Sequence, residues 1–213
     1  IAYDDIADTE PKYCHENTDQ DDLTKLMIAV QIKGHTGDDN FQPINIVRYG
    51  AGFYLTSELL TAIATELNGF TWSSTTLAKT DQAFTVDQLQ LVADGGHLSK
   101  VDLVDDITSV SDQTAVDAVL AKYEDLLGWV DGKAYFYTDI AHFGEDEGVN
   151  DKGIVRNHIY DINITKIAGL GTPVIDPTLP IEPSVPDEIE YNLQAQINIL
   201  RWKVVSQNVS FGE

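Results

Sequence analysis

The β character of this chain is clearest in the sequence DGKAYFYTDI, which occupies residues 131–140. It begins with Asp131-Gly132, a dipeptide typical of tight hairpin turns. The residues that follow are rich in tyrosine and phenylalanine, side chains that favour strands. The sequence therefore predicts a turn that leads into a strand over Lys133–Ile140. A second strand is expected over Ile154–Ile167, where Tyr160, Ile162 and Ile164 fall on one face.

The same β pattern continues outward from this stretch. Leu26, Ile28, Val30 and Ile32 recur with a period of two, which is the spacing of a half-buried strand. Further strands are predicted over residues 44–49, 84–92 and 191–211, with a turn at 94–96.

Two segments have the spacing of an amphipathic helix instead. The first, near 57–68, is expected to begin at a cap formed by Thr56 or Ser57 and to end at Asn68-Gly69. The second, near 113–127, is expected to begin at Asp112 and to stop at Gly128. Two helices are too few for a repeated strand–helix–strand fold. The pattern therefore predicts an all-β sandwich with two short helical excursions.

Residues 172–186 form a proline-rich strap. It contains Pro173, Pro177, Pro180, Pro183 and Pro186, five of the seven prolines in the chain. Because proline cannot donate to a strand ladder, we expect an extended surface connection here. The expected organisation is a β-sandwich domain over 1–190 and a separate C-terminal strand region over 191–213.

Composition narrows the function classes. Thirty-five acidic and 13 basic residues give a formal net charge of −22, which disfavours nucleic acid and anionic lipid as partners. Cys14 is the single cysteine, so no internal disulfide can form. No apolar run is long enough to span a membrane. The chain opens at Ile1 without an initiator methionine, and we expect a fragment or a processed product.

The sequence lacks the common motifs of catalysis and cofactor binding. The chain has no H-E-x-x-H, G-x-S-x-G or P-loop pattern, so we expect no enzyme activity, no cofactor and no metal site. The acidic stretch that follows His142 is interpreted as a solvated loop. A sugar-stacking platform remains an alternative to burial in the core for five aromatic residues: Trp72, Trp129, Trp202, Tyr135 and Tyr137.

Four segments together resemble one family. They are Gly132–His142, Gly153–Ile164 with the pattern VRNHxY, Leu193–Val205, and Lys12–Thr18 with the pattern YCxENT. The combination is similar to the C-terminal portion of Mfa-type fimbrillins, shaft subunits of type V pili in Gram-negative anaerobes. The resemblance covers roughly residues 12–211 and is loosest over about 50–130.

This resemblance implies a fold, a role and a location. The fold is a transthyretin-like β-sandwich, and the role is that of a structural subunit of a bacterial cell-surface fimbria that assembles by strand exchange. The implied partners are other fimbrillin subunits, in a homopolymer, together with a host or bacterial surface ligand. Export runs through the periplasm to the outer membrane, with membrane attachment only through an N-terminal lipid anchor that this chain does not contain. The alternative is an adhesin or carbohydrate-binding tip subunit on the same fold.

The C-terminal tail is the expected assembly element. Its apolar residues change phase twice, and one slip in register turns every side chain of a strand over. We therefore expect Tyr191–Ile199 to stay in the parent sheet and Leu200–Phe211 to serve a partner; the alternative is that the tail is the domain's own last strand. The expected interface residues are Leu200, Trp202, Val204, Val205, Val209 and Phe211.

The family motif adds a second group of residues: Arg156, Asn157, His158 and Tyr160. We expect these polar residues to hydrogen-bond between a loop and the sheet and not to take part in catalysis. His142 and His158 flank the acidic loop, and they become neighbours if their two strands pair antiparallel.

Overall fold

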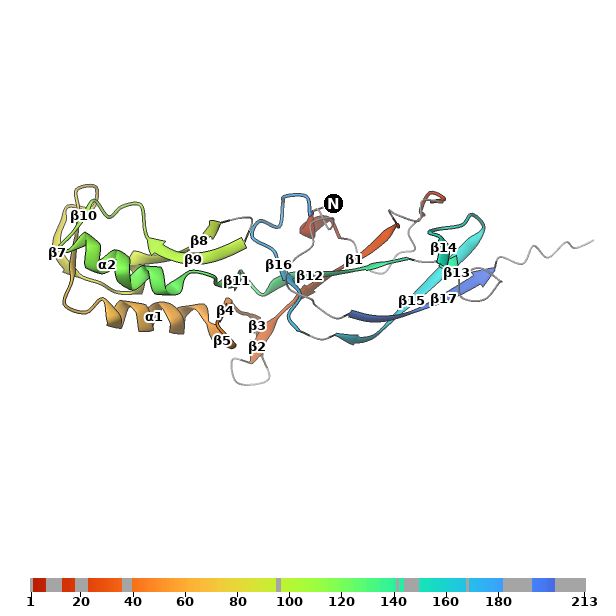
Figure 1. The fold of residues 1–213 in the computed structure, drawn as a ribbon, viewed down its shortest axis with the longest axis horizontal. Helices are drawn as coiled ribbons and strands as arrows, with labels where there is room; N and C mark the ends of the chain where they lie inside the picture. Colours follow the sequence, from red (N-terminus) through yellow and green to blue (C-terminus); the bar gives the residue numbers. More distant parts are fainter. Residues whose placement is uncertain are drawn as a thin grey trace, which may run out of the picture. The chain divides into compact units, whose positions relative to one another are not determined.

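The computed structural model describes residues 2–6, 13–17, 23–35, 40–94, 97–140, 142–143, 150–167, 169–181 and 193–201. Antiparallel strands dominate these residues, and two short α-helices interrupt them (Figure 1). The prediction of an all-β, sandwich-like fold with two helical excursions is confirmed. The chain forms two compact units, which are described separately: one comprises Ile1–Asp5, Ala29–Tyr135 and Leu170–Glu182, and the other Ile6–Ile28, Phe136–Gly169 and Pro183–Glu213.

The first unit is built from small antiparallel sheets. One has the order β11-β4-β5, a second β10-β6-β7, and two further pairs are β8-β9 and β2-β3. The strands are β2 (Lys33–His35), β3 (Phe41–Pro43), β4 (Ile46–Tyr49), β5 (Gly52–Leu55), β6 (Thr71–Ser74), β7 (Lys79–Ala83), β8 (Leu89–Asp94), β9 (His97–Leu103), β10 (Ser109–Val110) and β11 (Leu127–Trp129). Single-turn 3₁₀ helices lie at Tyr3–Asp5, Val86–Gln88 and Ala121–Tyr123. The predicted strand over 84–92 is therefore wrong in its first half, because Thr85 and Gln88 form a capping box that starts a 3₁₀ turn.

The turn at the start of the DGKAYFYTDI sequence forms as predicted. Asp131 and Gly132 have φ angles of 51° and 64°, and the Lys133 N–H donates to the carbonyl of Val130 at 2.9 Å. Two left-handed residues in succession are characteristic of a type I′ hairpin turn. The turn connects β11 to β12 (Lys133–Asp139). Strand β12 lies between β1 (Lys25–Gln31) and β16 (Thr172–Pro173) in a further three-stranded sheet.

Helix α1 spans Thr56–Glu66 and buries Leu59 and Ile63. The expected side-chain cap is wrong, since Leu55 occupies the cap position and makes no side-chain hydrogen bond. The helix ends near Gly69 as predicted, where φ reaches 103°.

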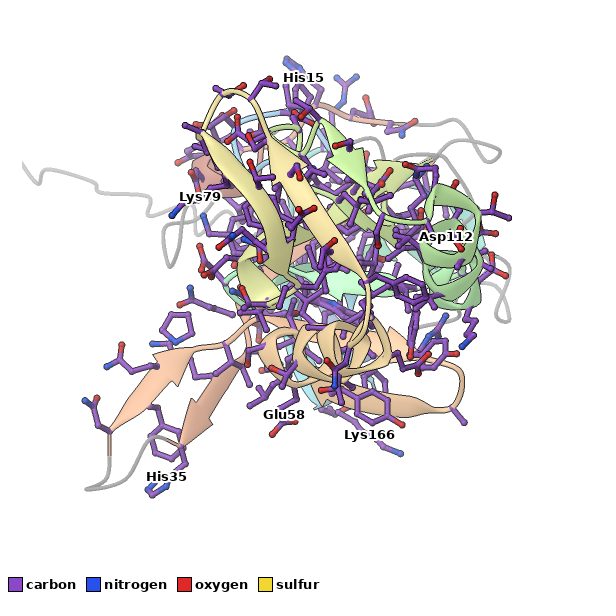
Figure 2. The ribbon with its side chains drawn as sticks, turned by 90° about the vertical axis from the view of Figure 1, so that its left-hand side faces the viewer. His15, His35, Glu58, Lys79, Asp112 and Lys166 are labelled. Carbon is purple, nitrogen blue, oxygen red and sulfur yellow. The ribbon has the colours of Figure 1, made fainter. Side chains whose placement is uncertain are left out.

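Helix α2 spans Gln113–Leu120, and Asp112 caps it as predicted (Figure 2). The Asp112 carboxylate accepts the Ala115 N–H at 3.0 Å. The predicted extension to residue 127 is wrong, because the chain turns at Asp125, with φ 60°, and Leu127 enters strand β11. Leu127 is still buried, so the apolar pattern indicated burial correctly and assigned it to the wrong element.

Both helices bury their apolar faces in the core of the first unit. Its buried members are Val47, Leu59, Ile63, Leu67, Trp72, Phe84, Leu89, Val101, Val116, Leu120, Tyr123 and Leu126. The Tyr123 hydroxyl donates to Glu66 at 2.6 Å and Lys122 contacts the same carboxylate at 2.8 Å, which joins the end of α1 to the turn after α2. Burial, followed by this hydrogen bond, raises the pKa of Tyr123 to about 12.

The proline-rich strap begins inside the sheet. Thr172 and Pro173 form β16, opposite Tyr135 and Ala134 of β12, and both are buried. The expectation of a surface connection from residue 172 is therefore wrong at its start. Proline is tolerated there because β16 is an edge strand. The predicted strap residues 182–186 lie outside the described residues.

The second unit contains two described strand pairs. Strand β13 (His142–Phe143) pairs with β14 (Asn150–Lys152), and β15 (His158–Ile167) pairs with β17 (Leu193–Arg201). Strand β15 begins four residues later than predicted, because Asn157 has a left-handed φ of 62°. In the described part of the chain, no helix is long and apolar enough to cross a membrane.

Candidate assembly site

Strands β15 and β17 form a long antiparallel ribbon. The register runs from His158 opposite Arg201 to Ile167 opposite Leu193, with an irregularity between Ile164 and Lys166. Half of the residues in β15 are isoleucine or threonine, which favour extended backbone and agree with the length of this strand.

The ribbon leaves much apolar surface uncovered. No residue of β15 is fully buried; His158, Tyr160 and Ile162 are half-buried, and the rest are exposed. Ile159, Ile164 and Ile167 keep 45%, 43% and 49% of their surface accessible. A two-stranded ribbon is only marginally stable in water by itself. The described part of the ribbon is therefore a sheet whose apolar side chains are only partly covered.

The tail predicted to donate a strand is described only up to Arg201. Leu200 lies opposite Ile159 and continues β17 without a break after Ile199, so the described strand ends two residues later than expected, at Arg201. The other predicted interface residues, Trp202, Val204, Val205, Val209 and Phe211, lie outside the described residues.

Two of the sequence motifs lie against each other in the second unit. The Arg156 guanidinium binds Glu16 through Nε at 2.9 Å and Nη2 at 2.7 Å, and both contacts are to the same carboxylate oxygen. Beside them, the Asn17 N–H donates to the carbonyl of Ile154 at 2.8 Å. Gly153 sits close to the same segment, because a Cβ there would lie 3.2 Å from the Asn17 carbonyl oxygen. The YCxENT segment and the VRNHxY segment therefore support one another.

The remaining motif residues anchor the start of β15. The Tyr160 hydroxyl accepts the Val155 N–H at 2.9 Å and lies 3.0 Å from Nδ1 of His142. Burial raises the pKa of Tyr160, although the bond from Val155 acts in the opposite direction. Nδ1 of His158 lies 2.9 Å from the Arg156 carbonyl across the turn at Asn157. These contacts join the start of β15 to the loop before it and to His142.

His142 and His158 are neighbours, as expected. Their ring centroids lie 4.9 Å apart with the planes at 74°. The expected reason is wrong, because β13 pairs with β14 and β15 with β17. Sequence reasoning also missed the roles of Glu16 and Val155. The acidic Glu16 beside the YCxENT asparagine was the only sequence signal for the ion pair with Arg156.

Part of the chain that contains His142 and His158 matches a known protein family. Residues 128–208 match the family described as "Major fimbrial subunit protein type IV, Fimbrillin, C-terminal". The match supports a fimbrillin C-terminal portion in this part of the chain. The match covers β12, the VRNHxY segment and the β15–β17 ribbon, and it confirms the resemblance predicted from the sequence. No match was found among curated proteins or among solved structures.

The family gives the fimbrillin portion a coarse role. Its description is that of a fimbrial subunit, which is a structural class of protein with a cell-surface, fimbrial location. Of the five aromatic residues considered for a sugar platform, Trp72, Trp129 and Tyr135 are buried, Tyr137 is half-buried and Trp202 lies outside the described residues. Among the residues that the structure describes, no group of three or more histidine, cysteine, aspartate or glutamate side chains is arranged to hold a metal.

Proposed function

We propose that this chain is a shaft subunit of a cell-surface fimbria, joined to its neighbours by strand exchange through the tail that follows Arg201. The proposed partners are further copies of the same subunit. The same proposal includes export through the periplasm and attachment at the outer membrane. It also includes the division of the chain into a domain over 1–190 and a strand region over 191–213.

The observation that carries the proposal is the partly exposed apolar surface of the β15–β17 ribbon. Strand β17 leads directly into Trp202, Val204, Val209 and Phe211, which are large apolar residues for a tail in so acidic a chain. A donated strand gains affinity from main-chain hydrogen bonds and specificity from alternate side chains in pockets. Each fully buried anchor of this size contributes roughly 1.5–3 kcal/mol.

The test is a truncation of the full-length subunit. Removal of residues 202–213 should leave a folded monomer that no longer forms fibres, as measured by circular dichroism and negative-stain electron microscopy. The matched control removes only Gly212 and Glu213 and keeps every proposed anchor. Fibres from the longer truncation would overturn strand donation by this segment, and loss of the fold would identify the tail as the domain's own strand.

Point variants separate the two faces of the tail. In a donated strand, neighbouring side chains point to opposite faces. Trp202→Ala should therefore reduce fibre formation, whereas Lys203→Ala should not. Equal effects of the two changes would contradict a strand that inserts one face into a partner. Selective glycan binding by a subunit that forms no fibres would instead favour the adhesin alternative.

A further inference from the structure

We propose that strand β5 pairs with the same strand of a second copy of this chain, antiparallel and about a two-fold axis at Phe53. The surface lies in the first unit and is separate from strand donation by the tail. Strand β5 is at one edge of the sheet β11-β4-β5, and no strand among the described residues pairs with its other side (Figure 1). The pairing would join two three-stranded sheets into one continuous sheet.

The first argument is the direction of the backbone groups of β5. A two-residue turn joins β4 to β5, so the flanking residues Tyr49 and Gly52 exchange hydrogen bonds across the hairpin. Bonded and non-bonded pairs alternate along an antiparallel ladder, which turns the N–H and C=O of Phe53 away from β4. The Thr56 N–H donates to the Asn45 carbonyl at 3.0 Å, in agreement with this alternation. Within the described part of the chain, the backbone of Phe53 makes no hydrogen bond.

These outward groups are complementary to themselves. When two copies of β5 run antiparallel with Phe53 opposite Phe53, the N–H of each donates to the carbonyl of the other. Leu55, two residues further along, faces the same edge and would lie opposite residue 51 of the second copy. An edge with unpaired N–H and C=O groups is a template for pairing with another chain. The β5 edge therefore fits a second β5 edge.

The side chains of β5 are apolar and exposed. Phe53, Tyr54 and Leu55 keep 55%, 44% and 39% of their surface accessible. Edge strands that stay single usually carry charged side chains, proline or a bulge. Strand β7 is an edge of this kind, since it contains Lys79 (labelled in Figure 2) and Asp81 and its register is irregular. Strand β5 has none of these features.

The distribution of charge favours a second copy as the partner at this edge. Two chains of net charge −22 repel each other, and 35 of the 213 residues are acidic. Residues 40–57 contain no aspartate or glutamate and a single basic residue, Arg48, which lies opposite Phe53 in β4. Two β5 strands therefore meet without bringing carboxylates together. The same stretch offers no carboxylate to a basic partner, whereas a second β5 is uncharged and apolar.

The contact is small, which sets the expected strength. A fully buried aromatic side chain covers about 150–250 Å², so Phe53 and Tyr54 together expose roughly 200 Å² per copy. A stable interface buries about 800 Å² per partner. We therefore expect a weak self-association that depends on protein concentration.

The first test places a single cysteine in β5 of the whole chain. In Cys14→Ser/Phe53→Cys, residue 53 meets its own copy at a Cα separation of about 5.5 Å, which suits a disulfide. A mild oxidant should therefore give a covalent dimer. The matched control is Cys14→Ser/Leu77→Cys, since Leu77 is 49% exposed and lies between β6 and β7. Equal yields of dimer from the two variants would overturn the proposal.

A measurement on the wild type keeps the test independent of how the variants fold. Hydrogen exchange at the amides of Phe53 and Leu55 should slow several-fold as the protein concentration rises from about 10 μM to 1 mM. The amides of Gly52 and Tyr54 are already bonded to β4 and should change little.

Exchange at Phe53 that does not depend on concentration would show that the edge stays single. Protection at Phe53 without a cross-link between two copies of residue 53 would show that another segment, such as the tail of a neighbouring subunit, occupies the edge. Either result would overturn the proposal.

Discussion

Gly132, in the turn that opens β12, gives the sharpest prediction of the structure. Its φ of 64° is left-handed, and a Cβ at this position would lie 2.1 Å from the Ile32 carbonyl oxygen. The neighbouring contacts, 2.8 and 2.9 Å, are also to Ile32 backbone atoms, so no side chain can move aside. Gly50 has a similar φ of 56° with no atom within 4 Å of its Cβ position. Alanine substitutions at Gly132 and Gly50 therefore separate the cost of a left-handed backbone from the cost of a steric clash.

The expected magnitudes follow from this difference. A left-handed conformation costs an alanine roughly 1–2 kcal/mol at either position. In Gly132→Ala, residue 32 must also withdraw by about 1 Å to reach an ordinary C···O separation of roughly 3.3 Å. That movement breaks the 2.8 Å bond from the Ile32 N–H to the Gly132 carbonyl, and an unsatisfied group costs a further 1–3 kcal/mol or so. We expect Gly132→Ala to destabilise by roughly 2–5 kcal/mol and Gly50→Ala by roughly 1–2 kcal/mol.

The assay is urea unfolding followed by far-ultraviolet circular dichroism, with both variants compared at the same temperature and ionic strength. The informative quantity is the difference between the two free energies of unfolding, about 1–3 kcal/mol, which corresponds to roughly 5- to 150-fold in the unfolding equilibrium. Equal destabilisation would refute the reasoning, because it would mean that residue 32 yields to the added methyl group at no cost.

Three further predictions concern other parts of the chain. Asp112→Ala should remove the cap of α2 and lower the free energy of unfolding, measured by urea unfolding, by about 1 kcal/mol. Asp112→Ser should retain most of the stabilisation that the cap provides. Because the pKa of Tyr123 is raised to about 12 in the folded state, its contribution to the free energy of unfolding should be complete below pH 10 and lost as the pH rises towards 12. Tyr123→Phe should flatten this part of the curve of stability against pH. An unchanged curve in the variant would contradict the prediction. The acidic stretch over 142–152 should bind no structural Ca²⁺, so a tight calorimetric isotherm with a chelator-sensitive melting temperature would contradict the interpretation as a solvated loop.

The sequence predicted best where one local rule acts alone. The Asp131-Gly132 turn, the Asp112 cap and the strand at 133–139 each depend on residues a few positions apart, and all three are present. It failed where a tertiary contact changed the element. Leu127 fits the helical stripe of α2, yet its backbone pairs with Arg48 of β4, which no local pattern near residue 127 can indicate.

The site shows the same division between local and long-range information. The individual motifs were visible in the sequence, and the family match covers the VRNHxY motif, which contains Arg156. Its partner Glu16 lies 140 positions away, so the ion pair between them depends on the fold. From the sequence, the two histidines were expected to meet only if their strands paired. They are in contact although β13 pairs with β14 and β15 pairs with β17.

The positions of the tryptophans have a spectroscopic consequence. Trp72 and Trp129 are 6% and 1% exposed, and each indole N–H is bonded to a backbone carbonyl within the first unit. Their emission should be blue-shifted in the native state and move to the red when that unit unfolds. The third tryptophan, Trp202, belongs to the second unit and lies outside the described residues. A Trp202→Phe chain would therefore emit from the first unit alone, so its fluorescence melting curve, set beside the circular dichroism curve of the whole chain, would reveal whether the two units unfold together or in turn.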